Sequence, residues 1–89
     1  MTIVSAQLSL YPLGQTDLSS PIEAVLAALS AHGLPYELGD MSTVTWGDDA
    51  VVFAALKDAF ARATEYGATV LTVTVSNACP LPQREKSLE

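Results

Sequence analysis

The chain has 89 residues, of which 49% are hydrophobic, and its formal net charge at pH 7 is −6. This length allows one domain with a small core, and such a domain buries roughly 60–65% of the surface that its unfolded chain would expose. Four Lys and Arg side chains stand against ten Asp and Glu, a balance that argues against binding nucleic acid, where affinity depends on neutralising phosphates.

Residues that carry redox, metal or nucleophilic chemistry are scarce. Cys79 is the single cysteine and His32 the single histidine, so we expect no internal disulfide, no metal site, no cofactor and no Ser-His-Asp set. No apolar stretch approaches the roughly 20 residues that a membrane span needs, and we expect no signal peptide. The sequence therefore predicts a cytoplasmic protein.

The first predicted element is a strand over residues 3–11, in which apolar and polar side chains alternate. The run 69–76 repeats the alternation. Because strand side chains have a period of two, each strand has one apolar face and one uncharged polar face. The polar-face residues are Ser5, Gln7, Ser9, Tyr11, Val70, Thr72, Thr74 and Ser76. Such a face suits a second subunit, a small polar ligand or both, although Thr also simply favours exposed strands.

Two helices are predicted, near residues 20–32 and 48–66. Ser20 followed by Pro21 is typical of a helix start, Glu23 completes a capping box, and Gly33 is typical of a helix end. Asp48 is a suitable N-cap for the second helix. The apolar stripe of the second helix is predicted to contain Val52, Phe53, Leu56, Ala59, Phe60 and Ala63.

Between the helices, residues 36–38 and 43–46 are predicted as two short strands joined by a turn at Gly39-Asp40. If Val44 and Trp46 face the core, then Met41, Thr43 and Thr45 lie on the polar face. The opposite parity stays open, because the run is short and the turn could hold a bulge.

The order strand, helix, strand, strand, helix, strand predicts an α+β fold of the ferredoxin-like βαββαβ type. Both helices would cover the apolar face of a four-stranded antiparallel sheet and leave the polar face open. We expect a single domain over residues 1–80. Residues 81–89 are expected to be a polar tail whose last two residues, Leu88-Glu89, look like a cloning remnant.

The chain offers few candidates for catalysis. Asp48 and Asp49 suit a helix start, where acidic groups are favoured, and are otherwise a metal or general-base pair. Asp40 is expected to be a turn residue or a ligand carboxylate, and Trp46 a core or interface residue or a wall against a flat ring. No nucleophile, base and orienting group can be assembled, so the sequence indicates a binding protein and not an enzyme.

Several short stretches carry a resemblance to a known family. They are residues 6–14 (AQLSLYPLG), 32–37 (HGLPYE), 41–44 (MSTV) and 47–48, followed by a Val-rich last strand. The chain resembles the YkoF-like thiamin-binding family of small ferredoxin-like proteins over nearly its whole length to about residue 76. The resemblance implies binding of thiamin or its hydroxymethyl-aminopyrimidine part, and assembly as a homotetramer whose sheets pack against one another.

The resemblance carries site positions over to Gln7, Ser9, Met41 and Thr43 and, less closely, to Asp48. Gln, Ser and Thr can hydrogen-bond an aminopyrimidine edge, and a flat ring needs an aromatic or thioether partner. The candidate ligand-binding residues are Gln7, Ser9, Tyr11, Met41, Thr43, Trp46 and Asp48. We expect a pocket on the open sheet face or at subunit interfaces.

The expected function is non-catalytic binding of thiamin or a related aminopyrimidine by a homodimer or homotetramer. Two alternatives remain. One is a structural or regulatory module whose open face binds only itself. The other is an enzyme with an active site at subunit interfaces, which would need a carboxylate of raised pKa in its cavity.

Overall fold

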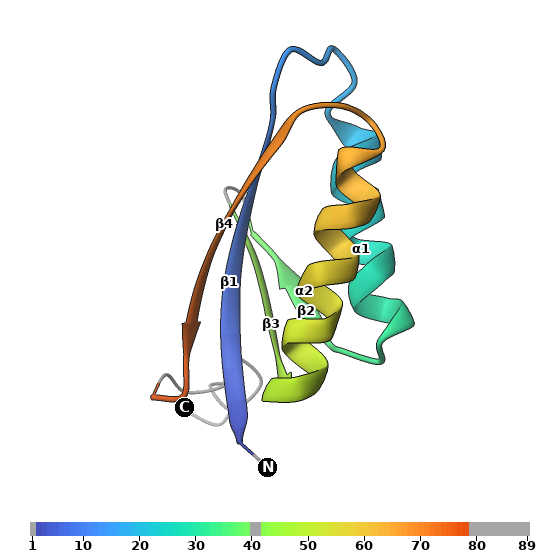
Figure 1. The fold of residues 1–89 in the computed structure, drawn as a ribbon. Coiled ribbons are helices and arrows are strands. Elements are labelled where there is room, and N and C mark those ends of the chain that lie inside the picture. The colour runs from blue at the N-terminus through green and yellow to red at the C-terminus, as the bar shows by residue number, and fades with distance from the viewer. Residues whose placement is uncertain (1, 40–41, 79–89) are drawn as a thin grey trace.

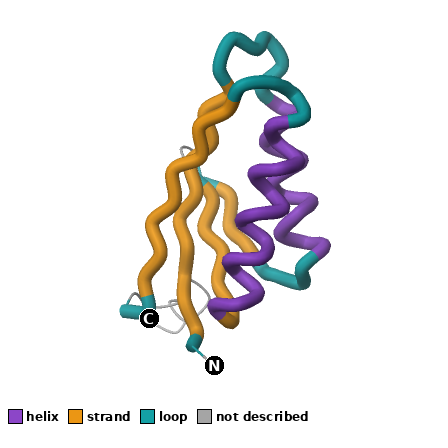
Figure 2. The backbone as a smooth tube through the Cα atoms, in the orientation of Figure 1, coloured by secondary structure: helices purple, strands orange, loops and turns teal. Residues whose placement is uncertain are grey.

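The computed structural model describes residues 2–39 and 42–78 of the chain. The periodic patterns of apolar residues in the strands and helices produce a two-layer fold. The elements are β1 (Ile3–Pro12), α1 (Ser19–Ala31), β2 (Tyr36–Leu38), β3 (Thr43–Asp48), α2 (Asp49–Thr64) and β4 (Thr69–Ser76). The strands form one sheet in the order β2-β3-β1-β4, and every neighbouring pair is antiparallel. Both helices cover the same face (Figure 1), and the layers are separate in Figure 2. The predicted ferredoxin-like fold is confirmed.

The two ends of α1 are fixed differently. Asp17 Oδ1 accepts hydrogen bonds from the backbone N–H of Ser19 and Ser20, at 3.0 and 3.2 Å, and Asp17 Oδ2 accepts from the Ser20 hydroxyl at 2.6 Å. The prediction that Ser20 caps this helix is therefore wrong, because a carboxylate one turn earlier already serves the free N–H groups. Gly33 ends the helix as predicted, with φ of 73° and its N–H donating to the Ser30 carbonyl at 2.9 Å.

The core lies between the helices and the apolar face of the sheet. Its buried members are Val4, Ala6 and Leu8 on β1, Val25, Ala28 and Leu29 on α1, Leu34, and Val52, Ala55, Leu56, Ala59 and Ala63 on α2. Ala28, Ala55, Ala59 and Ala63 have no exposed surface, so the two helices approach closely.

Two residues of the predicted stripe on α2 are not in this core. Phe53 is 56% exposed and Phe60 is 43% exposed, whereas Ala55 is fully buried. The buried stripe is rotated toward α1, so small alanines fill the helix–helix contact and the two phenylalanines fall on the flank facing away from α1. Their placement in the core was a wrong prediction.

The side chains of β3 also point to the opposite faces of the sheet from the arrangement considered first, in which Val44 and Trp46 face the core. Thr43 lies opposite Leu8 and Thr45 opposite Ala6, and directly opposite residues share a face, so both threonines face the helices. Thr45 is fully buried and its hydroxyl donates to the Pro35 carbonyl at 2.7 Å. Val44 and Trp46 therefore lie on the open face. A threonine can take a core position here because a carbonyl satisfies its hydroxyl.

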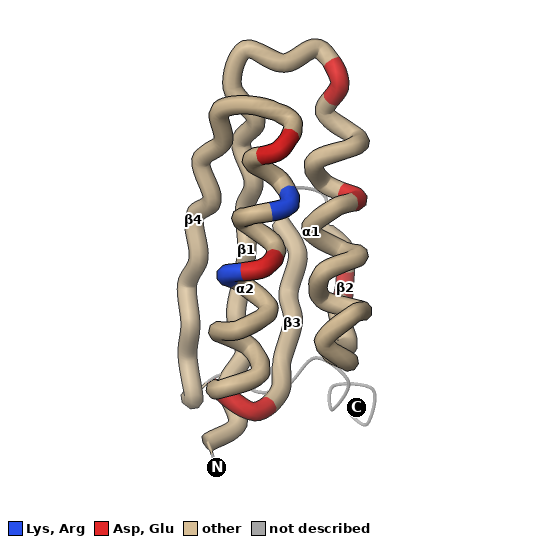
Figure 3. The backbone as a smooth tube through the Cα atoms, turned by 45° about the vertical axis from the view of Figure 1, so that its right-hand side comes forward, with Lys and Arg blue, Asp and Glu red and all other residues tan. Residues whose placement is uncertain are grey.

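An ionic cluster links the two helices on the side away from the sheet. Asp58 Oδ2 lies 3.2 Å from His32 Nε2, and Asp58 Oδ1 accepts from Arg62 Nε at 3.0 Å. His32 follows the last residue of α1 and, through its contact with Asp58, joins this helix to α2. The charged residues of α2 are visible in Figure 3.

We expect Asp58→Asn to lower the stability of the fold at neutral pH only. The hydrogen bond from Arg62 holds the pKa of the Asp58 carboxyl below its ordinary 3.8. A lowered folded-state pKa stabilises the protein above the unfolded-state value, and that contribution is lost as the pH falls through the folded-state value. Urea unfolding at neutral pH and well below 3.8 would measure the difference, which should vanish in acid. Glu65→Gln, at an exposed position, is the control, and a difference that persists in acid would contradict the prediction.

Candidate ligand-binding site

A cavity of about 400 Å³ lies between α1 and the helix-covered face of the sheet, where β2 leads into β3. Its volume falls within the range of roughly 300–1,000 Å³ that small-molecule sites occupy. Leu8, Leu10, Ile22, Val25, Leu38 and Leu71 form its apolar wall. Tyr11, Gly39, Ser42 and Thr43 also border it. The arrangement is an apolar pocket with hydroxyl groups at one end.

The local structure explains why these side chains meet. Ile22 and Val25 are one turn apart on α1, so they share the helix face above the sheet. Leu38 lies opposite Thr43 in the β2–β3 pair, which places both at the same end of the hairpin. Gly39 N–H donates to the Ser42 carbonyl at 2.8 Å and closes that hairpin. The cavity is thus bounded by four separate parts of the chain, namely β1, α1, the β2–β3 hairpin and β4.

The hydroxyl groups of Ser42 and Thr43 are the polar side chains at the cavity end nearest the hairpin. Thr43 is 8% exposed. Ser42 also accepts from Gln7 Nε2 at 3.5 Å, a long contact that connects the cavity border to the open face of the sheet. Among the described residues that border the cavity, none is Asp, Glu, Lys, Arg or His. The lining can therefore hold a ring and hydrogen-bond its edge.

The predicted site residues do not form one cluster. Gln7 and Ser9 lie on the open face, as predicted, whereas Thr43 projects from the opposite face. Gln7, Ser9 and Thr43 therefore do not share one face of the sheet, because a shift of one position along a strand moves a side chain to the other face. Met41 lies outside the described residues.

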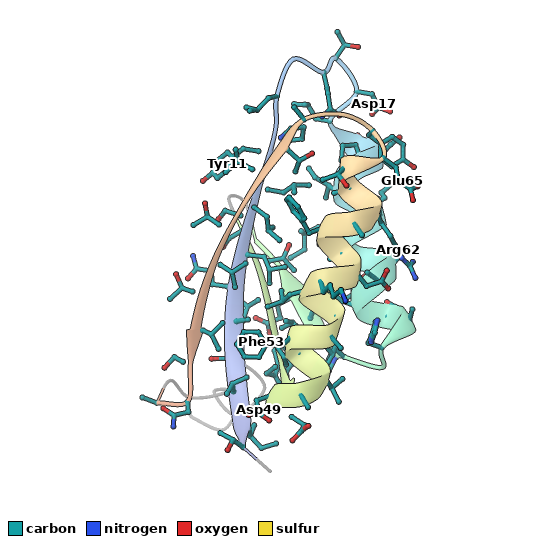
Figure 4. All side chains as sticks on the ribbon, viewed as in Figure 1. Tyr11, Asp17, Asp49, Phe53, Arg62 and Glu65 are labelled. Atoms are coloured by element: carbon teal, nitrogen blue, oxygen red, sulfur yellow. The ribbon has the colours of Figure 1, made fainter. Side chains whose placement is uncertain are left out.

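The other three candidates occupy separate positions. The Tyr11 side chain projects on the side of the sheet away from the helices (Figure 4). Tyr11 therefore borders the cavity through its backbone in the strand and not through its ring. Trp46 lies opposite Ser5 on the open face and is 9% exposed. Asp48 ends β3 opposite Ile3 and precedes α2, where its side chain makes no capping hydrogen bond.

The apolar wall of the cavity was not predicted as a site. Leu8, Leu10, Val25 and Leu71 follow the same periodic pattern as the core, and no sequence signal separates a residue beside a cavity from one packed against a neighbour. The polar hairpin after Leu38 was the one local indication that this wall ends near hydrogen-bonding groups. Over the described parts of the chain, no three His, Cys, Asp or Glu side chains are grouped to hold a metal. Within the same residues, none of the helices has the length and apolar character of a membrane span.

Comparison with known proteins assigns the chain to a protein family. A two-layer ferredoxin-like domain with a cavity under its first helix is the structural type, and the chain belongs to the YKOF-related family, whose model matches residues 3–82. No curated protein matches the sequence significantly. The family resemblance seen in the sequence is confirmed.

Solved structures share this fold at low sequence identity. A hypothetical protein from Methanocaldococcus jannaschii superposes with a TM-score of 0.84 at 21% identity, covering 99% of this chain and 97% of that one. A protein from Streptococcus pneumoniae has a TM-score of 0.80 at 21% identity, with 98% of each chain covered. A Thermotoga maritima protein described as a "putative thiamine biosynthesis/salvage protein" has a TM-score of 0.80 at 15% identity, covering 98% of this chain and 99% of that one.

Proposed function

We propose that the protein binds thiamin or a related aminopyrimidine without catalysis, as a cytoplasmic homo-oligomer. The cavity between α1 and the sheet is the observation that carries this proposal, since it combines ligand-sized volume, an apolar wall and two hydroxyl groups. Membership of the YKOF-related family and the thiamine-related description of one structural neighbour support the choice of ligand.

The lining suits a flat heterocycle with a polar edge. The ring would lie against the aliphatic side chains of Ile22, Leu38 and Leu10, and burial of that apolar surface stabilises the complex. A hydroxyl group can both donate and accept, so Thr43 and Ser42 can serve the amino group and a ring nitrogen of an aminopyrimidine. The net charge of −6 favours approach of the thiazolium cation of intact thiamin.

The same lining supports binding and not reaction. Hydroxyl and aliphatic groups position a ligand, whereas acid–base catalysis needs a titratable group at the reacting atom. An enzyme with its site between subunits would instead draw such a group from a second copy of the chain.

A homodimer or homotetramer is proposed because the open face of the sheet combines exposed apolar side chains with hydroxyl groups and carries little charge. Ile3, Tyr11 and Val70 on this face are 45%, 49% and 46% exposed, among Ser and Thr neighbours. A face of this composition suits burial against another sheet. If the protein bound no ligand at all, self-association through this face would be the remaining function.

We expect Thr43→Val to weaken thiamin binding by about 1–3 kcal/mol, or roughly 5- to 150-fold in affinity, because it leaves the ligand's polar edge unpaired at unchanged side-chain shape. Isothermal titration calorimetry with thiamin would measure the change. Thr74→Val is the matched control, since Thr74 is an exposed threonine on the open face of β4.

Gln7→Leu, measured in the same titration, distinguishes a ligand site in the cavity from one on the open face of the sheet. Gln7 lies on the open face and does not line the cavity, which it reaches only through its 3.5 Å contact with Ser42. Loss of binding in Gln7→Leu with normal binding in Thr43→Val would move the ligand to the open face. Absence of thiamin binding to the wild type, with or without these variants, would overturn the proposed ligand.

A further inference from the structure

The cavity between α1 and the sheet lacks a charged partner for an anionic ligand. Among the described residues that border it, none is Asp, Glu, Lys, Arg or His, and its polar end consists of the Ser42 and Thr43 hydroxyl groups. Proteins hold a phosphate group with Lys or Arg side chains or with the backbone N–H groups at the start of a helix. The positions of these groups therefore decide whether the cavity accepts a phosphorylated ligand.

The positive side chains lie away from the cavity. Over residues 2–39 and 42–78, Lys57 and Arg62 are the Lys and Arg side chains, and both are on α2 (Figure 3). Lys57 is exposed, and Arg62 Nε donates to Asp58 Oδ1 at 3.0 Å. Neither cation borders the cavity. A phosphate group inside it would therefore be buried without an opposite charge, which costs much free energy.

The start of α1 lies next to the cavity, but a carboxylate already occupies it. Ile22, in the first turn of α1, is on the cavity wall. Asp17 Oδ1 accepts from the backbone N–H groups of Ser19 and Ser20, the groups that a phosphate would need. The hydrogen bond from the Ser20 hydroxyl, together with these N–H groups, holds the pKa of the Asp17 carboxyl below its ordinary 3.8. Asp17 is thus charged at neutral pH and repels a second anion at this helix end.

Two more carboxylates are carried by the elements that form the cavity. Glu23 lies near the start of α1 and Glu37 is the middle residue of β2, and both are exposed. Figure 3 shows acidic positions on these two elements and no basic one. At the polar end of the cavity, Gly39 N–H already donates to the Ser42 carbonyl at 2.8 Å, so it does not serve a phosphate oxygen. The potential around the cavity is therefore negative and disfavours an anion.

We propose that the cavity takes only unphosphorylated ligands, thiamin or its aminopyrimidine alcohol, and rejects their phosphate esters, with Asp17 as a specificity-determining residue. This inference rests on the proposed function, since it concerns the same cavity. Asp17 acts through its charge and through the helix N–H groups that it occupies, and not through contact with the ligand. A ligand that acquires a phosphate ester elsewhere would not return to this site.

Titration calorimetry of the wild type at neutral pH with thiamin and with thiamin monophosphate tests the discrimination. We expect the phosphate ester to bind about 100-fold more weakly or not at all, because its charge finds no partner. The aminopyrimidine alcohol and its phosphate form a second pair without the thiazolium cation, and the same preference should hold. Equal affinities within either pair would overturn the inference and leave the proposed function intact. Binding of none of the four compounds would overturn the proposed function and this inference with it.

Asp17→Asn tests the role of the carboxylate. The substitution keeps a side-chain oxygen that can accept from Ser19 and Ser20 but removes the charge. We expect the preference for thiamin over thiamin monophosphate to fall by about 2- to 10-fold, as removal of one screened charge implies. Asp49→Asn is the matched control, since it removes a carboxylate at the start of α2, at the opposite end of the molecule (Figure 4). An unchanged preference in Asp17→Asn, or an equal change in both variants, would contradict the assigned role.

Discussion

Leu29→Ala should lower the free energy of unfolding by about 2–5 kcal/mol, the usual cost of removing a buried leucine side chain and leaving a cavity. Leu29 on α1 has no exposed surface and belongs to the cluster that joins both helices to β1. The loss is a large part of the roughly 5–15 kcal/mol that stabilises a typical domain. Urea unfolding followed by circular dichroism would measure it, at one fixed protein concentration because association adds to apparent stability.

Leu13→Ala is the matched control for this substitution. Leu13 follows β1 and is 51% exposed, so the same change of side chain should alter the free energy of unfolding by less than about 0.5 kcal/mol. Equal losses in the two variants would mean that the core is not centred on the contact between α1 and the sheet.

Gly47→Val should lower the free energy of unfolding by roughly 2–6 kcal/mol, from backbone strain and overpacking together. Gly47 has φ of 156° in β3, a conformation that a β-branched residue avoids. A Cβ atom at this position would lie 2.7 Å from Leu34 Cδ2, and Leu34 is buried. The expected loss is measurable by the same urea titration.

Gly14→Val separates the two causes. Gly14 also has a positive φ, 65°, but a Cβ atom there would meet nothing within 4 Å. This variant should lose only the strain contribution of about 1–3 kcal/mol. A loss in Gly14→Val as large as that in Gly47→Val would show that close contact with Leu34 has no part in the requirement for glycine.

The exposed apolar surface of this small domain is divided among distinct places. The open face and the cavity lie on opposite sides of the same sheet, so each can be altered separately by the substitutions proposed above. The cavity lies within a single chain, so its residues can be tested independently of assembly.

The sequence alone determined the type, order and approximate bounds of all six elements and the faces of β1 and β4. Strand alternation over residues 3–11 and 69–76 and the glycine after α1 are local signals, and local signals survive folding. The family resemblance added the expected fold and ligand class from short stretches that need no knowledge of packing.

The tertiary structure decided which residues meet. Pairing with β1 and the Pro35 carbonyl, which accepts a hydrogen bond from Thr45, decided which side chains of β3 face the helices. The sequence of this six-residue strand does not contain that information. Phe53 and Phe60 lie outside the core because α1 and α2 approach closely, and their contact favours alanines. The cavity has no sequence signal, because it is a gap among residues of ordinary core pattern, and its place is set by how α1 sits over the sheet.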